Sequence, residues 1–197
     1  MNKIILATNN KNKVNEITKL LSPFNIEVNS LKDLDLGDPV ENGLTFLENA
    51  TIKAKYAFDK TGLPSLADDS GFCVESLNNF PGLASSRFIK SVGGENNAFD
   101  VINKCINEVN KNCFFITSLV FIYKDKNGRV ITKDFEGKIE GKFTYPPRGN
   151  DGFGFDPIFT PNGYNQTFAE MLDTKIEISH RTRALKQFFE YFKTIQN

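Results

Sequence analysis

The sequence of 197 residues contains no tryptophan and a single histidine, His180. One histidine disfavours a zinc site, because such sites draw most of their ligands from several histidines and cysteines. The three cysteines, Cys73, Cys105 and Cys113, are odd in number and match no CxxC or zinc-binding spacing. We therefore expect reduced, structural thiols and a cytoplasmic location. Without tryptophan, the 19 phenylalanines must supply most of the aromatic packing.

The chain also lacks an excess of charge, since 24 basic residues balance 24 acidic ones. Broad nucleic-acid binding needs a net basic surface that displaces counterions, so we expect no nucleic-acid partner. A small anionic ligand needs only a few focused lysines or arginines. The N-terminal apolar run at residues 4–7 is too short for a signal peptide or a membrane span, so we expect a buried strand and no membrane partner.

The first third of the sequence alternates strand and helix patterns. Residues 3–8 and 26–30 predict strands, and residues 32–43 are rich in Asp, Gly and Pro and predict a loop. The apolar spacing predicts a helix over 11–21 with Asn10 as its N-cap. A second helix is predicted over 45–60 and is ended by Gly62.

The remaining residues are richer in strand patterns. Residues 65–67 predict a short strand before an Asp-Ser-Gly turn, with 72–75 as its continuation. Asn127-Gly128 predicts a hairpin between two strands. The other predicted elements are a helix over 97–109, strands over 113–123 and 129–136, loops around short strands over 144–166, and a helix from Ser179. With no repeat or linker, we expect one α/β domain over 1–197 with a mixed sheet.

The corner Thr8-Asn9-Asn10-Lys11-Asn12-Lys13 joins a predicted strand to a helix start. Free N–H groups and the positive end of the helix dipole make such a corner an anion site. Lys13 in the first turn could neutralise a phosphate, although the glycines of a Walker loop are absent. The alternative is that Asn10 only caps the helix and that Lys13 is solvated.

Two further charged residues could join a phosphate site. Lys53 borders the buried face of its helix and could be a second phosphate ligand, or it could extend to solvent. Glu41 in the preceding loop is a hard oxygen ligand, and one or two carboxylates plus substrate phosphates suffice for magnesium. As a loop glutamate it could equally be solvated.

The stretch Leu66-Ala67-Asp68-Asp69-Ser70-Gly71 places two carboxylates after an apolar strand. A carboxylate there could hold magnesium or act as a general base towards water. Asp-Ser-Gly is also ordinary turn chemistry. If the strand continues through both carboxylates, their side chains point to opposite faces and need not share one role.

Four later segments have both functional and structural interpretations. The five arginines include Arg87 and Arg148, each a bidentate donor or a structural ion-pair partner. Residues 152–157 combine glycines, aromatic rings and one carboxylate, which suits stacking on a base or packing in a core. Ser179-His180-Arg181 could bind a base edge, or it could be a helix cap followed by a surface histidine.

Together these segments resemble the inosine triphosphate pyrophosphatase family, hydrolases that remove non-standard purine nucleotides. The matching stretches extend from Leu6 to Leu185, and their joint presence in this order is specific. They are LATNNKNK, LTFLENATIKA, LADDSGFCV, PGLASSRF, FEGKIEG, PPRGNDGFGFDPIF, TFAEM and ISHRTRAL.

The resemblance implies an elongated mixed β-sheet flanked by helices, two lobes with a central active-site cleft, and a homodimer. It also implies magnesium-dependent hydrolysis of ITP, dITP or XTP between the α and β phosphates. The products would be a nucleoside monophosphate and pyrophosphate.

The resemblance also assigns roles to individual residues. Asp69 would be the general base, Glu41 and Asp69 would hold Mg2+, and Asp68 would help to place metal or water. Ser70 would touch the substrate. The residues on the phosphate side would be Thr8, Asn9, Asn10, Lys11, Asn12, Lys13 and Lys53. The base pocket would contain Phe153, Gly154, Phe155, Asp156, Lys175, His180 and Arg181, with Phe153 stacking on the base.

Three rival hypotheses remain compatible with the sequence. A related pyrophosphatase could prefer pyrimidine or methylated nucleotides, which the motifs FGFD and SHR disfavour. A non-catalytic nucleotide-binding protein is disfavoured by the presence of Asp69, Lys13 and Lys53. A nucleic-acid binder is disfavoured by the neutral charge.

Overall fold

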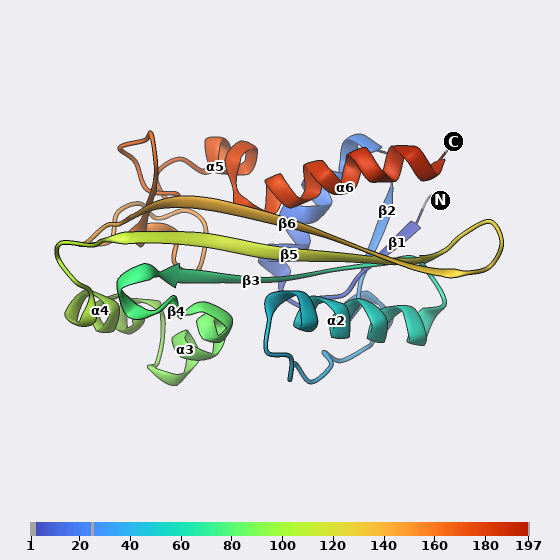
Figure 1. Ribbon diagram of the computed structural model, residues 1–197, viewed down its shortest axis with the longest axis horizontal. Helices are drawn as coiled ribbons and strands as arrows, with labels where there is room; N and C mark the ends of the chain where they lie inside the picture. Colours follow the sequence, from blue (N-terminus) through green and yellow to red (C-terminus); the bar gives the residue numbers. More distant parts are fainter. Residues whose placement is uncertain (1–2, 25, 197) are drawn as a thin grey trace. The chain divides into compact units, whose positions relative to one another are not determined.

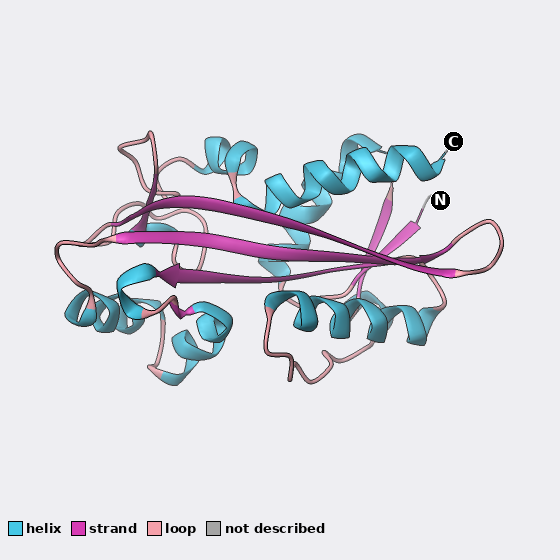
Figure 2. Ribbon diagram, in the orientation of Figure 1, coloured by secondary structure: helices cyan, strands magenta, loops and turns pink. Residues whose placement is uncertain are grey.

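The computed structural model describes residues 3–24 and 26–196, which form an α/β fold around a mixed sheet (Figure 1). The seven strands follow the order β2-β1-β3-β5-β6-β7, with β4 paired to β3. β1 is parallel to β2 and β3, whereas β3 with β4 and β6 with β7 are antiparallel. Helices flank the sheet (Figure 2), so the predicted α/β class is confirmed.

The strands and helices have the following bounds. The strands are β1 (Lys3–Leu6), β2 (Glu27–Ser30), β3 (Ser65–Val74), β4 (Phe80–Pro81), β5 (Asn112–Lys124), β6 (Val130–Phe143) and β7 (Phe159–Pro161). The α-helices are α1 (Lys11–Leu21), α2 (Phe46–Thr61), α3 (Ser85–Ser91), α4 (Glu95–Cys105), α5 (Leu172–Ile178) and α6 (His180–Gln196). Short 3-10 helices are η1 (Ser22–Phe24), η2 (Lys32–Leu34), η3 (Glu75–Leu77), η4 (Gly82–Ala84) and η5 (Asp156–Ile158).

The chain forms two compact units. Unit 1 contains the residues up to Asp69, Thr117–Glu136 and the residues from Ala184 on, and unit 2 contains Ser70–Ile116 and Gly137–Arg183. Strands β3, β5 and β6 contribute residues to both units. The predicted domain over 1–197 with a cleft between two lobes stays a prediction.

Unit 1 buries both faces of its strands. Ile4 and Leu6 of β1 pack with residues of α1 and α6, whereas Ile5 and Ala7 pack with residues of α2. In Figure 1, α2 and α6 lie on opposite sides of these strands. A strand covered on both faces needs apolar residues at every position, which explains the uninterrupted run at residues 4–7.

Side-chain and glycine caps fix the ends of the two helices that matter most for unit 1. Asn10 accepts hydrogen bonds from the backbone N–H groups of Asn12 and Lys13, so its predicted role as N-cap of α1 is confirmed. Thr45 caps α2 by accepting a bond from the Glu48 N–H. Gly62 ends α2 with a φ of 67°, a left-handed conformation that glycine adopts without strain.

The core of unit 2 consists largely of phenylalanine. The ring of Phe72 stacks on Phe155 at a centroid distance of 4.9 Å, and Phe115 meets Phe159 edge to face, also at 4.9 Å. Such aromatic pairs stabilise a core beyond the burial of their area. The expectation that phenylalanine replaces tryptophan in aromatic packing is confirmed for this core.

A single glycine allows β7 to approach β6. Gly141 of β6 pairs with Pro161, and a Cβ atom at position 141 would lie 2.3 Å from the carbonyl oxygen of Thr160. No side chain fits at that separation. The second glycine of FEGKIEG, Gly141, is therefore required by the close contact between the two strands.

The predicted interruption of β3 is wrong. The chain continues as one strand, β3, through the Asp-Asp-Ser-Gly stretch, so neither a turn nor a break occurs there. Pairing with β1 ends at Leu66, and β5 is the neighbour of β3 on its other side, so these short turn-forming residues adopt extended backbone within a paired strand. The alternative that Asp-Ser-Gly forms an ordinary turn is thereby excluded.

The predicted helix over 97–109 is wrong at both ends, because α4 covers Glu95–Cys105. Ile106 has extended backbone angles, and Asn107 accepts a hydrogen bond from the Val109 N–H to form a local turn. Val109 is 96% exposed and belongs to no apolar helix face.

Several other boundaries also differ from the predictions. The first strand ends at Leu6 instead of residue 8, the second begins at Glu27, and the strand predicted over 129–136 continues to Phe143. The hairpin turn at Asn127-Gly128 is confirmed by the bond from the Gly128 N–H to the Asp125 carbonyl. Helices α3 and α5 were not predicted, and both have only seven residues.

Candidate functional site

Asp68 and Asp69 lie on opposite faces of β3 and form ion pairs with different helices. The Asp68 Oδ2 atom lies 2.9 Å from the Nζ of Lys13 in α1. The Asp69 Oδ1 atom lies 3.0 Å from the Nζ of Lys53 in α2. The two carboxylates therefore have separate partners, as the alternation of a continuous strand predicts.

The corner before α1 contains the predicted helix cap, and its role as a phosphate site stays a prediction. Asn10 does cap the helix, and its own N–H donates to the Thr8 hydroxyl. Lys13 is not solvated, because its ammonium is held against Asp68. Asn9 donates to the Leu36 carbonyl, and the two remaining predicted residues, Lys11 and Asn12, are exposed.

Lys53 does not extend to solvent. Its side chain is 6% exposed, and its Nζ lies 3.0 Å from Asp69 and 3.2 Å from the Oε1 of Glu41. Burial favours the neutral amine and lowers the Lys53 pKa, but the attraction of Asp69, Asp68 and Glu41 outweighs it and raises the pKa overall. Lys53 is therefore a fixed cation, and Glu41 is held near it although the residue itself is exposed.

Asp69 is a buried carboxylate with an altered proton affinity. Burial raises the pKa of Asp69 above its usual range, and this effect exceeds the opposing attraction of Lys53. Its backbone carbonyl also accepts a hydrogen bond of 3.2 Å from the Thr117 hydroxyl. A carboxylate with a raised pKa is a stronger base than an ordinary aspartate.

The donors of this group suit magnesium better than a softer metal. Among residues 3–24 and 26–196, no group of three or more His, Cys, Asp or Glu side chains could hold a metal ion alone. Glu41 and Asp69 nevertheless both lie within 3.2 Å of the same Lys53 Nζ. Two converging carboxylates fit an ion that takes one or two protein oxygens and completes its shell with water and phosphate.

A second set of predicted residues gathers in unit 2. The Lys175 Nζ lies 2.6 Å from the Oδ2 of Asp156, and both side chains are 3% exposed. The same Oδ2 accepts a bond of 2.9 Å from the Phe153 N–H. Lys175 also lies 4.7 Å from the centroid of the Phe153 ring. The buried pair therefore fixes both the backbone and the ring of Phe153, which is half-buried.

The loop around Phe153 depends on its glycines. Gly152 has a φ of 77°, and a Cβ atom there would lie 2.3 Å from the Oδ2 of Asp156. Gly154 donates its N–H to Glu95 at 2.7 Å. Gly152 is thus required by its close contact with the Asp156 carboxylate, and Gly154 is favoured by its positive φ of 65°.

The remaining predicted residues of unit 2 are largely buried. Phe155 packs in the phenylalanine core, which is the structural alternative considered for it. His180 is not a surface residue, because it is buried and its ring stacks on Phe115 at 4.9 Å. Arg181 is also buried, and Ser179 accepts a bond from the Thr182 N–H at the start of α6.

The other candidate residues are two arginines and Ser70. Arg148 donates to the Asn165 carbonyl and lies 3.6 Å from Glu170, which agrees with a structural ion pair. Arg87 is exposed and donates to the Leu83 carbonyl within its own helical segment. Ser70 is half-buried and follows Asp69 in β3.

Asn49 and Thr117 contact Asp69 and were missed by the sequence reasoning. Asn49 donates from its Nδ2 to the Asp69 Oδ2 at 3.3 Å. It lies one turn before Lys53, on the face of α2 that the apolar residues occupy. A polar side chain on that face was a signal that could have identified Asn49. No comparable signal marked Thr117 within its apolar strand.

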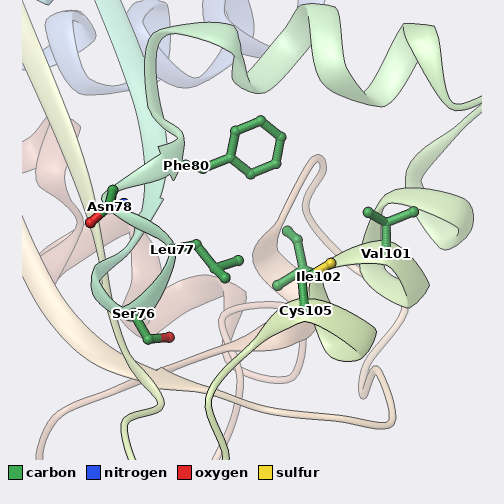
Figure 3. Close-up of a pocket in the computed structure, with 7 residues that line it drawn as sticks. All are labelled: Ser76, Leu77, Asn78, Phe80, Val101, Ile102 and Cys105. Atoms are coloured by element: carbon green, nitrogen blue, oxygen red, sulfur yellow. The ribbon is translucent and has the colours of Figure 1, made fainter.

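A separate cavity of about 360 Å3 lies in unit 2 beside η3, β4 and α4 (Figure 3). None of the predicted site residues lines it. Its walls are mainly apolar and include Leu77, Phe80, Ile102 and the thiol-bearing Cys105. The predicted chemistry and this cavity therefore involve different residues.

The sequence and the fold match one family of proteins. The model of the Ham1 family matches residues 4–191, and the chain belongs to this family. It is 40% identical over 211 aligned residues to a dITP/XTP pyrophosphatase of Bartonella quintana, covering 98% of this chain and 96% of that protein.

Solved structures give the same result. A HAM1 protein from Coxiella burnetii has a TM-score of 0.85 and 33% identity, and the match covers 98% of this chain and all of that one. A nucleoside-triphosphatase, dITP/XTP pyrophosphatase, from Mycobacterium abscessus has a TM-score of 0.71 and 32% identity, with 94% and 97% of the two chains covered. The resemblance inferred from the motifs is therefore confirmed. Within the described residues, no helix has the length and apolar character needed to cross a membrane.

Proposed function

We propose that this chain is a nucleoside-triphosphate pyrophosphatase that hydrolyses ITP, dITP and XTP to the monophosphate and pyrophosphate. Relatives that it matches over almost their full length carry the name dITP/XTP pyrophosphatase. The observation that carries the proposal is the buried Asp69 carboxylate, which is held by Lys53 with Glu41 beside the same ammonium.

The charged group of unit 1 supplies what hydrolysis of a phosphoanhydride requires. Such a reaction depends on charge neutralisation and an oriented water more than on covalent chemistry. Lys13 and Lys53 are fixed cations that can stabilise the phosphate oxygens, and the corner from Thr8 to Asn12 offers further donors. Asp69, with its raised pKa, accepts the proton of the attacking water.

Magnesium is the proposed cofactor, and Glu41 and Asp69 would hold it. Bound there, the ion would neutralise negative charge on the phosphate oxygens. Asp68 keeps its ion pair with Lys13 and so places that lysine. The carboxylates and lysines of unit 1 thus divide the work between holding the cation and holding the phosphates.

The second set, in unit 2, is proposed to bind the base. Phe153 presents a ring fixed by Lys175 and Asp156, and a fixed ring is suited to stacking. His180 and Arg181 supply donors for the carbonyl at position 6, which hypoxanthine and xanthine have and adenine lacks. Phe155 supports this loop from the core, Gly154 gives the base access to backbone, and Ser70 contacts the substrate.

The assay that tests this function measures pyrophosphate released from ITP, dITP, XTP, GTP, ATP, dTTP and UTP, with and without magnesium. We expect rapid release from the first three and slow release from ATP. Hydrogen bonds to a substrate group can discriminate by roughly four orders of magnitude. Faster cleavage of dTTP or UTP than of ITP would contradict the purine assignment.

We further propose a homodimer in the cytoplasm that binds neither nucleic acid nor membranes.

A further inference from the structure

Asn49 is a buried polar residue that makes a hydrogen bond with each end of its amide. It is 1% exposed. Its Nδ2 donates to the Oδ2 of Asp69 at 3.3 Å, and its Oδ1 accepts from the Gly43 N–H at 2.8 Å. The side chain therefore links the reactive carboxylate of β3 to the loop before α2.

The link to that loop is tight. A Cβ atom at Gly43 would lie 2.7 Å from the Asn49 Oδ1 and 2.7 Å from the Glu48 Cβ. Gly43 does not have a positive φ. The position needs glycine because a Cβ atom would collide with Asn49 and Glu48, and not because of its backbone conformation. Glu41 lies two residues before this contact. The loop that carries Glu41 is thus packed directly against Asn49.

The two oxygens of Asp69 are held by different residues of α2. Oδ1 faces the Lys53 ammonium, and Oδ2 faces the Asn49 amide. A carboxylate held at both oxygens cannot rotate freely about its terminal torsion. Its remaining lone pairs then point in a fixed direction, which a base or a metal ligand requires.

We propose that Asn49 is a positioning residue for the hydrolysis, acting through Asp69 and through the loop that bears Glu41. The inference rests on the proposed function. It differs from a purely structural role, in which Asn49 would only satisfy two buried hydrogen-bonding groups. A structural role predicts a loss of stability, whereas a positioning role predicts a loss of turnover that depends on Asp69.

Asn49→Asp separates the two bonds. The new side chain still accepts from the Gly43 N–H, but it replaces the amide donor by a second carboxyl group beside Asp69, so Asn49→Ala, which adds no charge, is measured beside it. We expect kcat for ITP to fall by about tenfold to a hundredfold, the scale of a small misplacement in an active site, with KM changed much less. Asn127→Asp, an exposed substitution of the same type in the β5–β6 turn, is the matched control and should leave kcat unchanged.

A double-mutant cycle decides between the two roles. In an Asp69→Asn background, Asn49→Asp should cost less than about twofold in kcat, because residues that act as one unit are not additive. An equal factor in both backgrounds would show a structural role and overturn the proposal. Urea unfolding of each variant verifies that it is folded. Asn49→Ala serves as the second variant if Asn49→Asp does not fold.

The same measurements distinguish failure of this inference from failure of the proposed function. An inactive wild-type chain would refute the proposed function and with it the role of Asn49. An active wild-type chain with a fully active Asp69→Asn variant would refute the assigned base, and the role of Asn49 with it. If Asp69→Asn is inactive and Asn49→Asp is fully active, only the role of Asn49 is wrong.

Discussion

At the scale of residues, five charged side chains in unit 1 are arranged so that each cation is matched before any ligand arrives. Lys13 holds Asp68, and Lys53 holds both Asp69 and Glu41. Buried charges cost several kcal/mol unless they are paired, so these contacts offset the cost of burying Lys53, Asp68 and Asp69. Removal of Lys13 or Lys53 would leave a buried carboxylate without this cation.

Replacement of Asp69 tests its assignment as the base. We expect Asp69→Asn to retain nucleotide binding, because the amide preserves shape and the lysines remain. Turnover should fall at least about a hundredfold, the usual scale for a lost general base. Steady-state kinetics with ITP and equilibrium binding of the nucleotide measure the two effects. Nearly normal turnover would show that another group accepts the proton.

The cysteines should differ in reactivity by their burial. Burial raises the pKa of Cys73 to about 12 and raises the pKa of Cys113 as well, so both stay protonated at pH 8. Cys105 is exposed. Because thiolates are the reactive form, we expect a disulfide reagent at pH 8 to label one thiol quickly in the folded chain and three in urea. Cys105→Ser should remove the fast phase, and rapid labelling of two thiols would contradict the burial of the others.

At the scale of elements, α2 carries much of the site of unit 1. Thr45, Asn49 and Lys53 follow one another at four-residue intervals, and Thr45 caps the helix from which the other two project. Lys53 and Asn49 reach Asp69 only because this face of α2 packs on the sheet. The position and start of the helix therefore set the position of both contacts to the carboxylate.

The N-cap of α2 can be tested with a matched pair of substitutions. Thr45→Ala removes the acceptor of the Glu48 N–H and should lower the free energy of unfolding by about 1 kcal/mol. Thr51→Ala, in the middle of the same helix, should be neutral or slightly stabilising because alanine has the higher helix propensity. Urea unfolding measures both values. If both variants lost the same free energy of unfolding, the loss in Thr45→Ala could not be assigned to the N-cap.

Elements with strong periodicity were predicted well from the sequence, and those shaped by tertiary contacts were not. The helix over 11–21 was placed at its observed bounds, because a side-chain cap and an apolar stripe are local signals. The break in β3 was wrong because pairing with neighbouring strands overrides the turn preference of Asp-Ser-Gly. Helices of seven residues, such as α3 and α5, are too short to show a clear period.

The candidate site shows the same division. The structure places Lys53 against Asp69 and Lys13 against Asp68, whereas their predicted roles towards a substrate stay predictions. The burial of His180 and the role of Phe155 in the core depend on which rings pack together, and a sequence pattern does not contain that information. Asn49 was overlooked although it is a polar residue on an apolar helix face, and its contact with Asp69 depends on the tertiary structure.

At the scale of the whole molecule, the fold should not depend on the cofactor. Among the described residues, three buried hydrophobic clusters contain phenylalanine, and Lys53 forms ion pairs with the two carboxylates proposed to hold the metal. We therefore expect a chelator to abolish hydrolysis while the thermal unfolding midpoint stays unchanged. Calcium-free and magnesium-free buffers with and without chelator give the comparison. A large fall in the midpoint would show that a metal is part of the folded structure.

The uninterrupted course of β3 determines which face of the strand each of its two carboxylates occupies. Positions 68 and 69 belong to opposite faces, so inserting or deleting one residue just before them would exchange their partners and offer Asp69 to Lys13. An even shift would keep the faces but move both groups by roughly 7 Å along the strand. This short segment therefore tolerates replacement of residues far better than any change in their number, and its length is as much a part of the site as its chemistry.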